Sequence, residues 1–376
     1  MEHYLDNAAT TKVCDEAAQA ALAAMTENYG NPSSTHTKGR EAKQLLDKSR
    51  KQVADALGCT AQELVFTSCG SESDNWAILN GAELMRRKGM HIISSQVEHD
   101  AVRKSLDELE RRGFEVTRLK PDGTGAIPVQ AVMEALRPDT VLVTLMLVNN
   151  ETGAVTDIGA IAKAMKKAGS QALLHTDAVQ AFMKLPFTVK SLGADLVSVS
   201  GHKIHAPKGI GALYIKNGVK LKPFLLGGGQ EEGRRAGTEA MPQIAAFAAA
   251  CREAGEHLQE NYERMAGLRQ LAMDELRRDI PELVIIGGGA PHILSISLPG
   301  WRSEVLMNYL EAREIYVSKS SACKKGGRSH VLEAIGLTPK VIDGAIRIGL
   351  SRFTTREDIL ALCAALKEAR SKLAHG

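Results

Sequence analysis

The clearest indication of the fold comes from the sequence DLVSVSGHK at positions 195–203. Its apolar run is typical of a short buried strand, and the strand is followed by the polar side chains of Ser200, His202 and Lys203. A second apolar run, LLHTDA at positions 173–178, contains the carboxylate of Asp177 near its end. Short apolar runs of this kind are typical of strands in the interior of a sheet.

The same pattern continues on both sides of these runs. Apolar runs of strand length alternate with amphipathic stretches of helical length from about residue 63 to residue 215. The expected strands are 63–67, 91–94, 116–119, 141–147, 172–177, 196–200 and 211–215, and the expected helices are 75–88, 102–111, 129–136 and 158–168. This alternation predicts an α/β fold with a mostly parallel seven-stranded sheet, covered by helices on both faces. Ligands of such sheets bind beyond the carboxyl ends of the strands, where Ser71, Asp177 and Lys203 fall.

The remainder of the chain predicts a smaller α+β domain. A long helical segment with a bend is expected from residue 241 to residue 276. Strands at 284–286 and 293–298 and helices at 304–312 and 356–373 are expected to follow it. A chain of 376 residues exceeds one ordinary core, so we expect a large cofactor-binding domain at 12–250 and a small domain that includes 251–376.

Composition and charge argue against several classes of protein. With 47 basic and 44 acidic residues, the net charge of +3 gives no argument for binding to nucleic acid or membranes. The apolar run 141–148 is too short to span a bilayer, and a motif that begins at Tyr4 leaves no room for a leader peptide. The six cysteines are scattered without a CxxC pair, which favours free thiols over disulfides or a metal site. We therefore expect a cytoplasmic protein.

A lysine and an aspartate at the tips of neighbouring strands are what pyridoxal 5′-phosphate requires. The lysine bonds covalently to the cofactor, and the aspartate keeps the pyridine nitrogen protonated so that the ring can accept electrons. Taken singly, Lys203 is better explained by a surface lysine, and Asp177 by a helix cap. Ser200 and His202 add donors for a phosphate beside Lys203, and the combination favours the cofactor.

The turn TSCGSES at positions 67–73 is the expected phosphate site. It takes a strand through a glycine into a helix, whose amino terminus presents free amides and a partial positive charge to an anion. Gly70 and Ser71 would then contact the phosphate. A turn rich in serine and glycine is also an ordinary helix cap, so the turn alone leaves both interpretations open.

Together these residues resemble the cysteine desulfurases, which are class V aminotransferases of fold type I. The shared motifs, in order, are YLDNAATT (4–11), NPSS (31–34), EH (98–99), NNE (149–151), GGGQE (227–231), RAGT (235–238) and RIGLSRFTT (347–355). Each motif is weakly specific, but the ordered set is strongly specific. Family members usually have Gly-Ala-Thr where this chain has Cys69, Gly70 and Ser71, and the serine keeps the hydroxyl. The resemblance implies that residues 1–11 belong to the small domain.

The resemblance also implies roles for individual residues. His99 would stack on the pyridine ring and move protons, because its charge changes near neutral pH. Asn150 and Gln180 would touch the phenolic oxygen of the cofactor or the substrate. Thr238 would reach the cofactor phosphate of a second subunit, which implies a homodimer. Arg347 would bind the substrate carboxylate.

The resemblance points to Cys323 as the catalytic nucleophile. It lies in a polar segment, SSACKKGGRS at 320–329, whose Ser-Ala-Cys triplet matches the family's mobile loop. Three lysines and an arginine between 319 and 328 favour the thiolate. A basic surface loop with an incidental cysteine is the alternative. The loop is about two residues shorter than in typical members, which leaves its reach and its sulfur acceptor open.

The resemblance therefore implies a cysteine desulfurase, which converts L-cysteine to L-alanine and leaves the sulfur on Cys323 as a persulfide. Lys203 would remove the Cα proton of the substrate. The sulfur would pass to an acceptor protein, such as an iron–sulfur scaffold or an enzyme of tRNA thiolation or thiamine synthesis. Three alternatives stay open: a small-substrate aminotransferase, a selenocysteine lyase and a non-catalytic sulfur-assembly scaffold.

Overall fold

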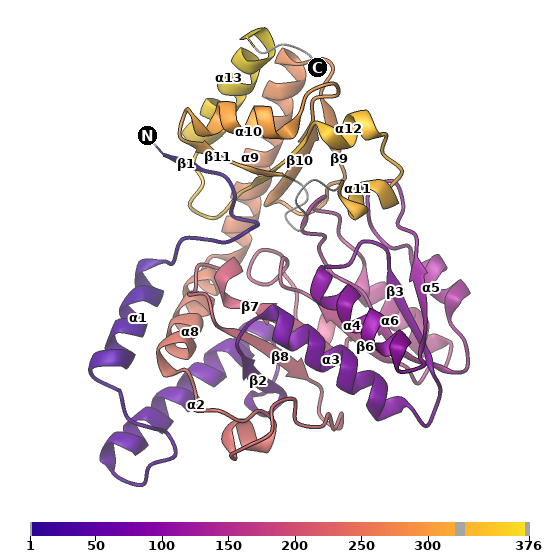
Figure 1. Ribbon diagram of the computed structural model, residues 1–376. Coiled ribbons are helices and arrows are strands. Elements are labelled where there is room, and N and C mark those ends of the chain that lie inside the picture. The colour runs from indigo at the N-terminus through magenta and orange to yellow at the C-terminus, as the bar shows by residue number, and fades with distance from the viewer. Residues whose placement is uncertain (1, 320–327, 373–376) are drawn as a thin grey trace.

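The computed structural model describes residues 2–319 and 328–372, which form two bodies around separate sheets (Figure 1). The larger body contains a seven-stranded sheet. Its strands, in spatial order, are β2 (Leu64–Thr67), β8 (Gly211–Ile215), β7 (Leu196–Ser200), β6 (Leu173–Asp177), β5 (Thr140–Thr144), β3 (His91–Ser95) and β4 (Glu115–Leu119). Only β8 runs antiparallel to its neighbours, so the predicted mostly parallel sheet is confirmed.

The interior strands consist of consecutive buried residues. Every residue of β5, β6 and β7 is buried, as expected for parallel strands that are covered on both faces. The helices that follow the strands are α3 (Gly70–Met85), α4 (Asp100–Arg111), α5 (Val129–Ala135), α6 (Ile158–Lys167) and α7 (Val189–Leu192). Helix α3 begins at Gly70 instead of residue 75. Its polar first turn borders a cavity, so that turn lacks the apolar periodicity from which a helix is predicted.

Two helices at the amino-terminal end were not expected from the sequence. They are α1 (Asp15–Thr26) and α2 (Thr37–Leu57), which pack along α8 (Met241–Glu256), as Figure 1 shows. Helix α8 is buried along most of its length, and its many alanines allow neighbouring helices to approach closely. Because these helices pack on one another, they lie outside the strand–helix alternation.

The predicted bend in the long helical segment is confirmed. Helix α8 ends at Glu256 and α9 runs over Leu258–Asp279, so the break falls at His257. The smaller body has an antiparallel sheet in the order β12 (Ser318–Lys319), β13 (Ala345–Gly349), β10 (Ile293–Ser297) and β9 (Val284–Ile286). Its helices are α10 (Ser303–Glu311), α11 (His330–Ala334), α12 (Pro339–Asp343) and α13 (Arg356–Lys372). Strand β1 (His3–Tyr4) pairs with β11 (Ile315–Tyr316) and ties the amino terminus to this body.

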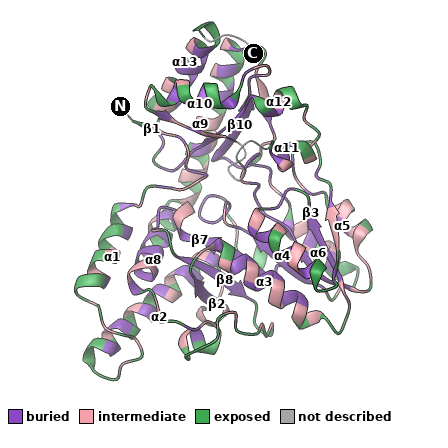
Figure 2. Ribbon diagram, in the orientation of Figure 1, coloured by how far each residue is buried: buried purple, intermediate pink, exposed green. Residues whose placement is uncertain are grey.

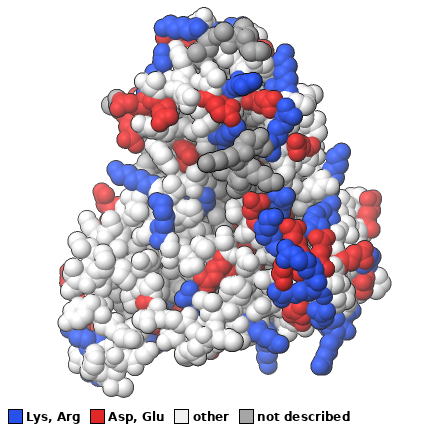
Figure 3. Space-filling view, viewed as in Figure 1, with Lys and Arg blue, Asp and Glu red and all other residues white. Residues whose placement is uncertain are grey.

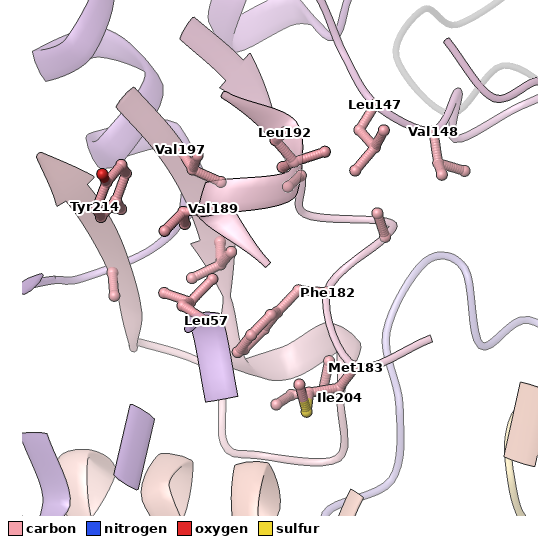
Figure 4. Close-up of a cluster of buried hydrophobic side chains, with 14 of the residues drawn as sticks. Leu57, Leu147, Val148, Phe182, Met183, Val189, Leu192, Val197, Ile204 and Tyr214 are labelled. Atoms are coloured by element: carbon pink, nitrogen blue, oxygen red, sulfur yellow. The ribbon is translucent and has the colours of Figure 1, made fainter. Parts of the chain in front are cut away.

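Most of the buried apolar residues of the two bodies fall into two clusters, although the cluster of the larger body also includes Ala8, Ala290, Ile293 and Val331. Buried residues are purple in Figure 2. Figure 4 shows part of the larger core, where Phe182, Met183 and Ile204 lie together. Ala254 of α8 belongs to this core, whereas Met265 of α9 belongs to the core of the smaller body. This separation supports our proposal of a large domain at 12–250 and a small domain made of 1–11 and 251–376, with the change of core a few residues beyond 250.

The described surface carries charges of both signs. On the face shown in Figure 3, basic and acidic side chains are interspersed, most densely around α4. There Arg118 pairs with Asp107 and Glu110. Within residues 2–319 and 328–372, no helix is long and apolar enough to cross a membrane.

Candidate active site

A cavity of about 360 Å³ lies at the carboxyl ends of β6 and β7, between the two bodies. A volume in this range suits a small-molecule ligand. The cavity brings together all the predicted site residues except Cys323 and Thr238, namely Gly70, Ser71, His99, Asn150, Asp177, Gln180, Ser200, His202, Lys203 and Arg347. The large body and the small body both contribute side chains, so the cavity requires the two bodies to pack together.

Lys203 lies in a short 3-10 turn (Gly201–Lys203) directly after β7. Its Nζ donates to the backbone carbonyls of Ala8 at 2.8 Å and Ala9 at 2.7 Å. Burial, reinforced by the positive charge of Arg347, lowers the pKa of the Lys203 amine to about 8. A substantial fraction of this amine is therefore neutral near physiological pH, which is the form that reacts with a carbonyl or accepts a proton.

Asp177 is the last residue of β6 and is buried. Its Oδ1 accepts the backbone N–H of Val179 at 2.9 Å. Burial raises the pKa of this carboxyl, while the neighbouring His99, the N–H of Val179 and the Lys203 amine oppose the rise. A buried carboxylate needs a cation beside it, and a protonated ring nitrogen would meet that need.

The expected phosphate site has the features of an anion cradle. Helix α3 begins at Gly70, and the side chain of its N-cap residue, Cys69, makes no capping hydrogen bond. Among the described residues, the buried Oγ of Ser200 has no hydrogen-bond partner. A Cβ added at Gly70 would lie 2.7 Å from Cγ2 of Val179, so an alanine here would require the Val179 side chain to shift. Free first-turn amides and an unsatisfied hydroxyl at the cavity fit the phosphate of the expected cofactor.

Three histidines border the cavity, and two of them, His99 and His202, were predicted site residues. His202 is half-buried, and its Nδ1 lies 3.2 Å from Oγ1 of Thr10. Burial, followed by the charges of Lys203 and Lys208, lowers the pKa of His202 to about 4, so its imidazole is neutral. His99 is exposed at the N-cap of α4, where its Nδ1 accepts the N–H of Ala101 at 3.1 Å. In neutral His99 the ring proton therefore lies on Nε2.

Arg347 of β13 is only 3% exposed and connects the two bodies. One Nη donates to the carbonyl of Asn150 at 2.9 Å, and the other donates to Ser318 Oγ at 2.7 Å and pairs with Asp6 at 3.1 Å. Its Nε has no partner among the described residues. A guanidinium at the cavity with an unused N–H can bind a carboxylate, although it also pairs with Asp6 of the same body.

A buried neighbour holds Asn150 in place. Asn149 donates to the carbonyl of Val97 at 2.9 Å, and its Oδ1 accepts the backbone N–H groups of Glu151 and Thr152, each at 2.9 Å. These bonds fix the turn that presents Asn150 to the cavity. The NNE motif therefore contains one structural asparagine and one asparagine that lines the site.

Three buried carboxyls at the cavity were not predicted. Burial raises the pKa of Glu98 to about 8 and that of Glu151 to about 7, and it raises the pKa of Asp74 well above its ordinary value. Ser329 Oγ lies 2.5 Å from a carboxyl oxygen of Glu151. The signal in the sequence was the position of Glu98 and Glu151 beside His99 and Asn150, but burial could not be inferred from it.

Thr238 and Cys323 do not join this cavity. Thr238 is exposed and is not among the lining residues, so a role at a partner's site stays a prediction. Cys323 lies outside the described residues. Of the cations expected to favour its thiolate, Lys319 pairs with Glu304, and Arg328 pairs with Asp343 at 2.8 Å. Their charges are therefore partly compensated within the small body.

The comparisons with known proteins agree with this site. The model of the family Aminotransferase class-V matches residues 3–362, so the chain belongs to that family. It is 41% identical to "Cysteine desulfurase IscS" of Methanosarcina thermophila, over 98% of this chain and 92% of that protein. It is 42% identical to "Cysteine desulfurase IscS" of Escherichia coli O139:H28, over 95% of this chain and 89% of that protein.

Solved structures give the same result. A "NIFS-LIKE PROTEIN" superposes with a TM-score of 0.93 at 36% identity, over 99% of this chain and 100% of that one. "SspA in complex with cysteine" has a TM-score of 0.81 at 33% identity, over 94% of this chain and 100% of that one. Within the class V family, the function of this chain is that of a cysteine desulfurase, an enzyme of the pyridoxal-phosphate-dependent type.

Proposed function

We propose that the chain binds pyridoxal 5′-phosphate in the cavity at the strand ends and converts L-cysteine to L-alanine, with the sulfur received by Cys323 as a persulfide. The observation that carries this proposal is that Lys203 and Asp177 line one cavity beside an anion cradle. A relative solved in complex with cysteine supports cysteine as the substrate.

Each group of the cofactor has candidate partners. Lys203 would hold it covalently, Asp177 would face its ring nitrogen, and His99 would cover its ring. The phosphate would be held by Gly70, Ser71, Ser200 and His202, with Thr238 of a second subunit, and the phenolic oxygen by Gln180 or Asn150. When bound, the cofactor supplies an electron sink for the Cα carbanion of the substrate.

Each side chain of the site then has its own role in the reaction of cysteine. Arg347 and Asn150 bind and orient its carboxylate, and the Lys203 amine takes the Cα proton. The Cys323 thiolate attacks the substrate sulfur, so that the S–S bond of the persulfide forms as the Cβ–S bond breaks. The electron pair of the broken bond stays on the substrate carbon. Proton transfer to that carbon, and the return of a proton to Cα, give alanine, with Nε2 of His99 and the Lys203 amine as the candidate donors.

The decisive experiment measures sulfide and alanine release from cysteine, in the presence of a reductant, by wild type, Cys323→Ala and Cys69→Ala. Cys69 is the matched control because it also lines the cavity but lies at the end of a strand, where it cannot carry sulfur outward. We expect Cys323→Ala to lose about hundredfold or more of the activity and Cys69→Ala to keep it. Mass spectrometry after cysteine treatment should find the extra sulfur on the Cys323 peptide.

Other outcomes would select another function. Keto acid in place of alanine would indicate an aminotransferase, and much faster turnover of selenocysteine would indicate a lyase for that substrate. No turnover at all would indicate a scaffold. Persulfide on Cys69, or full activity of Cys323→Ala, would contradict the assigned nucleophile.

We also propose a cytoplasmic homodimer that passes sulfur to an acceptor protein, either an iron–sulfur scaffold or an enzyme of tRNA thiolation or thiamine synthesis. The five described cysteines are all free thiols, which supports a reducing compartment. The exposed position of Thr238 supports contact with a second subunit.

A further inference from the structure

Lys184 is a buried lysine close to the cavity. It ends the turn that follows β6, directly after Met183, whose φ of 54° is left-handed. Its side chain is only 5% exposed. Lysine is almost never buried to this extent without a carboxylate partner. Within residues 2–319 and 328–372, however, no carboxylate forms an ion pair with Lys184.

The hydrogen-bond partner of Lys184 is the side chain of Gln180. Nζ of Lys184 donates to Oε1 of Gln180 at 3.5 Å. At its other end, Nε2 of Gln180 donates to the carbonyl of Ala8 at 2.9 Å. The same carbonyl accepts Nζ of Lys203 at 2.8 Å. A chain of hydrogen bonds therefore joins the buried lysine to the carbonyl that holds the Lys203 amine.

The two neighbours of Gln180 require the same orientation of its amide. The carbonyl of Ala8 can only accept a hydrogen bond, so it requires the NH₂ end. The Lys184 amine donates, so it requires the oxygen end. Burial, with the charges of Lys203 and Arg347, lowers the pKa of Lys184 well below its ordinary value, but a neutral amine still has N–H groups to donate. Because the Ala8 carbonyl takes the NH₂ end, Oε1 faces the Lys184 amine, which can donate to it in either charge state.

We propose that Lys184 is a positioning residue that fixes the amide of Gln180, so that its second N–H is available to the phenolic oxygen of the cofactor. This inference rests on the proposed function, because it needs the cofactor in the cavity that Gln180 lines. Without Lys184, no donor holds Oε1, so the amide is held only through the Ala8 carbonyl and its second N–H is less firmly directed toward the phenolic oxygen.

The test is a double-mutant cycle on the holoenzyme with Lys184→Met, Gln180→Ala and the combined variant. Lys190→Met is the control, because Lys190 is exposed on α7. The readouts are the dissociation constant for pyridoxal 5′-phosphate and the position of the visible absorption band of the bound cofactor. Lys184→Met should weaken binding roughly threefold to tenfold and move the band toward that of Gln180→Ala. The combined variant should match Gln180→Ala, because Lys184 acts only through Gln180.

The inference would be overturned if the loss of cofactor affinity in the combined variant equalled the sum of the two single losses. It would also be overturned if Lys184→Met left cofactor binding and the absorption band unchanged. Thermal unfolding of each variant separates a folding defect from a local one. If Lys184→Met fails to fold, Lys184→Gln, which keeps a donor, is compared with Lys184→Leu in its place. A wild-type protein that binds no pyridoxal 5′-phosphate would overturn the proposed function as well. If the wild type binds the cofactor, the double-mutant cycle tests only the role of Lys184.

Discussion

The Lys203 amine is held by two backbone carbonyls, not by a direct bond to a carboxylate. These carbonyls stabilise the ammonium form only partly, and burial lowers the pKa to about 8. Below this pKa the amine is protonated and unreactive, and above it the neutral form dominates. The reactivity of Lys203 should therefore change near pH 8, well below the ordinary range of a lysine.

We expect the rate of pyridoxal 5′-phosphate incorporation into the apoprotein to rise as the pH increases toward 8 and to level off above it. Asp177→Asn removes a negative charge that raises the Lys203 pKa, so this variant should shift the midpoint to lower pH. Borohydride should then fix the cofactor on the peptide that contains Lys203. Attachment at Lys208 or Lys216 would refute the assignment.

Asp177→Asn should also lower turnover of cysteine by roughly a hundredfold or more, because an amide cannot stabilise a pyridinium charge. The protein should remain folded, since the substitution removes a buried charge. Asp195→Asn is the control, because Asp195 pairs with Lys216 at 2.9 Å outside the cavity, and its loss should leave turnover unchanged. Near-normal turnover of Asp177→Asn would mean that Asp177 only caps the end of β6.

Between elements, the contact that matters most to the site joins the amino-terminal segment to β13. The N–H of Gly349 donates to the carbonyl of Leu5 at 2.7 Å, and Asn7 Nδ2 donates to the carbonyl of Gly349 at 2.9 Å. A Cβ added at Gly349 would lie 2.5 Å from the backbone nitrogen of Ala8. Backbone atoms cannot move aside as a flexible side chain can, so this contact requires glycine.

Gly349→Ala should therefore lower the free energy of unfolding by about 1–3 kcal/mol and weaken cofactor binding, because it displaces the Ala8 carbonyl. Gly267→Ala in α9 is the matched control. A Cβ there meets no atom within 4 Å, so alanine should stabilise the helix by about 0.5–1 kcal/mol. Urea denaturation measures both effects. Equal changes in the free energy of unfolding of the two variants would show that the close approach of the Ala8 backbone to Gly349 does not affect stability.

The strands of the large sheet were predictable because strands buried on both faces are continuous apolar runs. The start of helix α3 was predicted at residue 75 instead of Gly70, because the first turn of the helix lines the cavity and lacks an apolar pattern. Helices α1 and α2 were missed because they lie outside the alternation of strands and helices from which α3 to α6 were predicted. Packing on the sheet was not decisive, because α8, which packs on α1 and α2, was predicted as part of the segment 241–276.

At the scale of the whole molecule, we expect a dimer in analytical ultracentrifugation. Thr238→Ala should weaken cofactor binding without dissociating the dimer. Mixed dimers of Lys203→Ala and Thr238→Ala subunits should contain one site with both residues intact, because the Thr238 that serves a site belongs to the other subunit. Such mixtures should bind cofactor more tightly than Thr238→Ala alone. A fully active monomer would contradict the shared site.

The order of the strands' apolar runs, the motifs and their spacing were enough to predict the α/β fold, the family and the strand ends that carry Asp177 and Lys203. These features are local, because a buried strand can be recognised from a run of consecutive apolar residues. The carbonyls of Ala8 and Ala9 at Lys203, the buried state of the three extra carboxyls and the bond from Lys184 to Gln180 follow from the tertiary structure alone. The carbonyl contacts and the burial of the carboxyls depend on segments far apart in the chain, which only the packing of the two bodies brings into contact. The bond from Lys184 to Gln180 lies within one turn and depends on how that turn is buried.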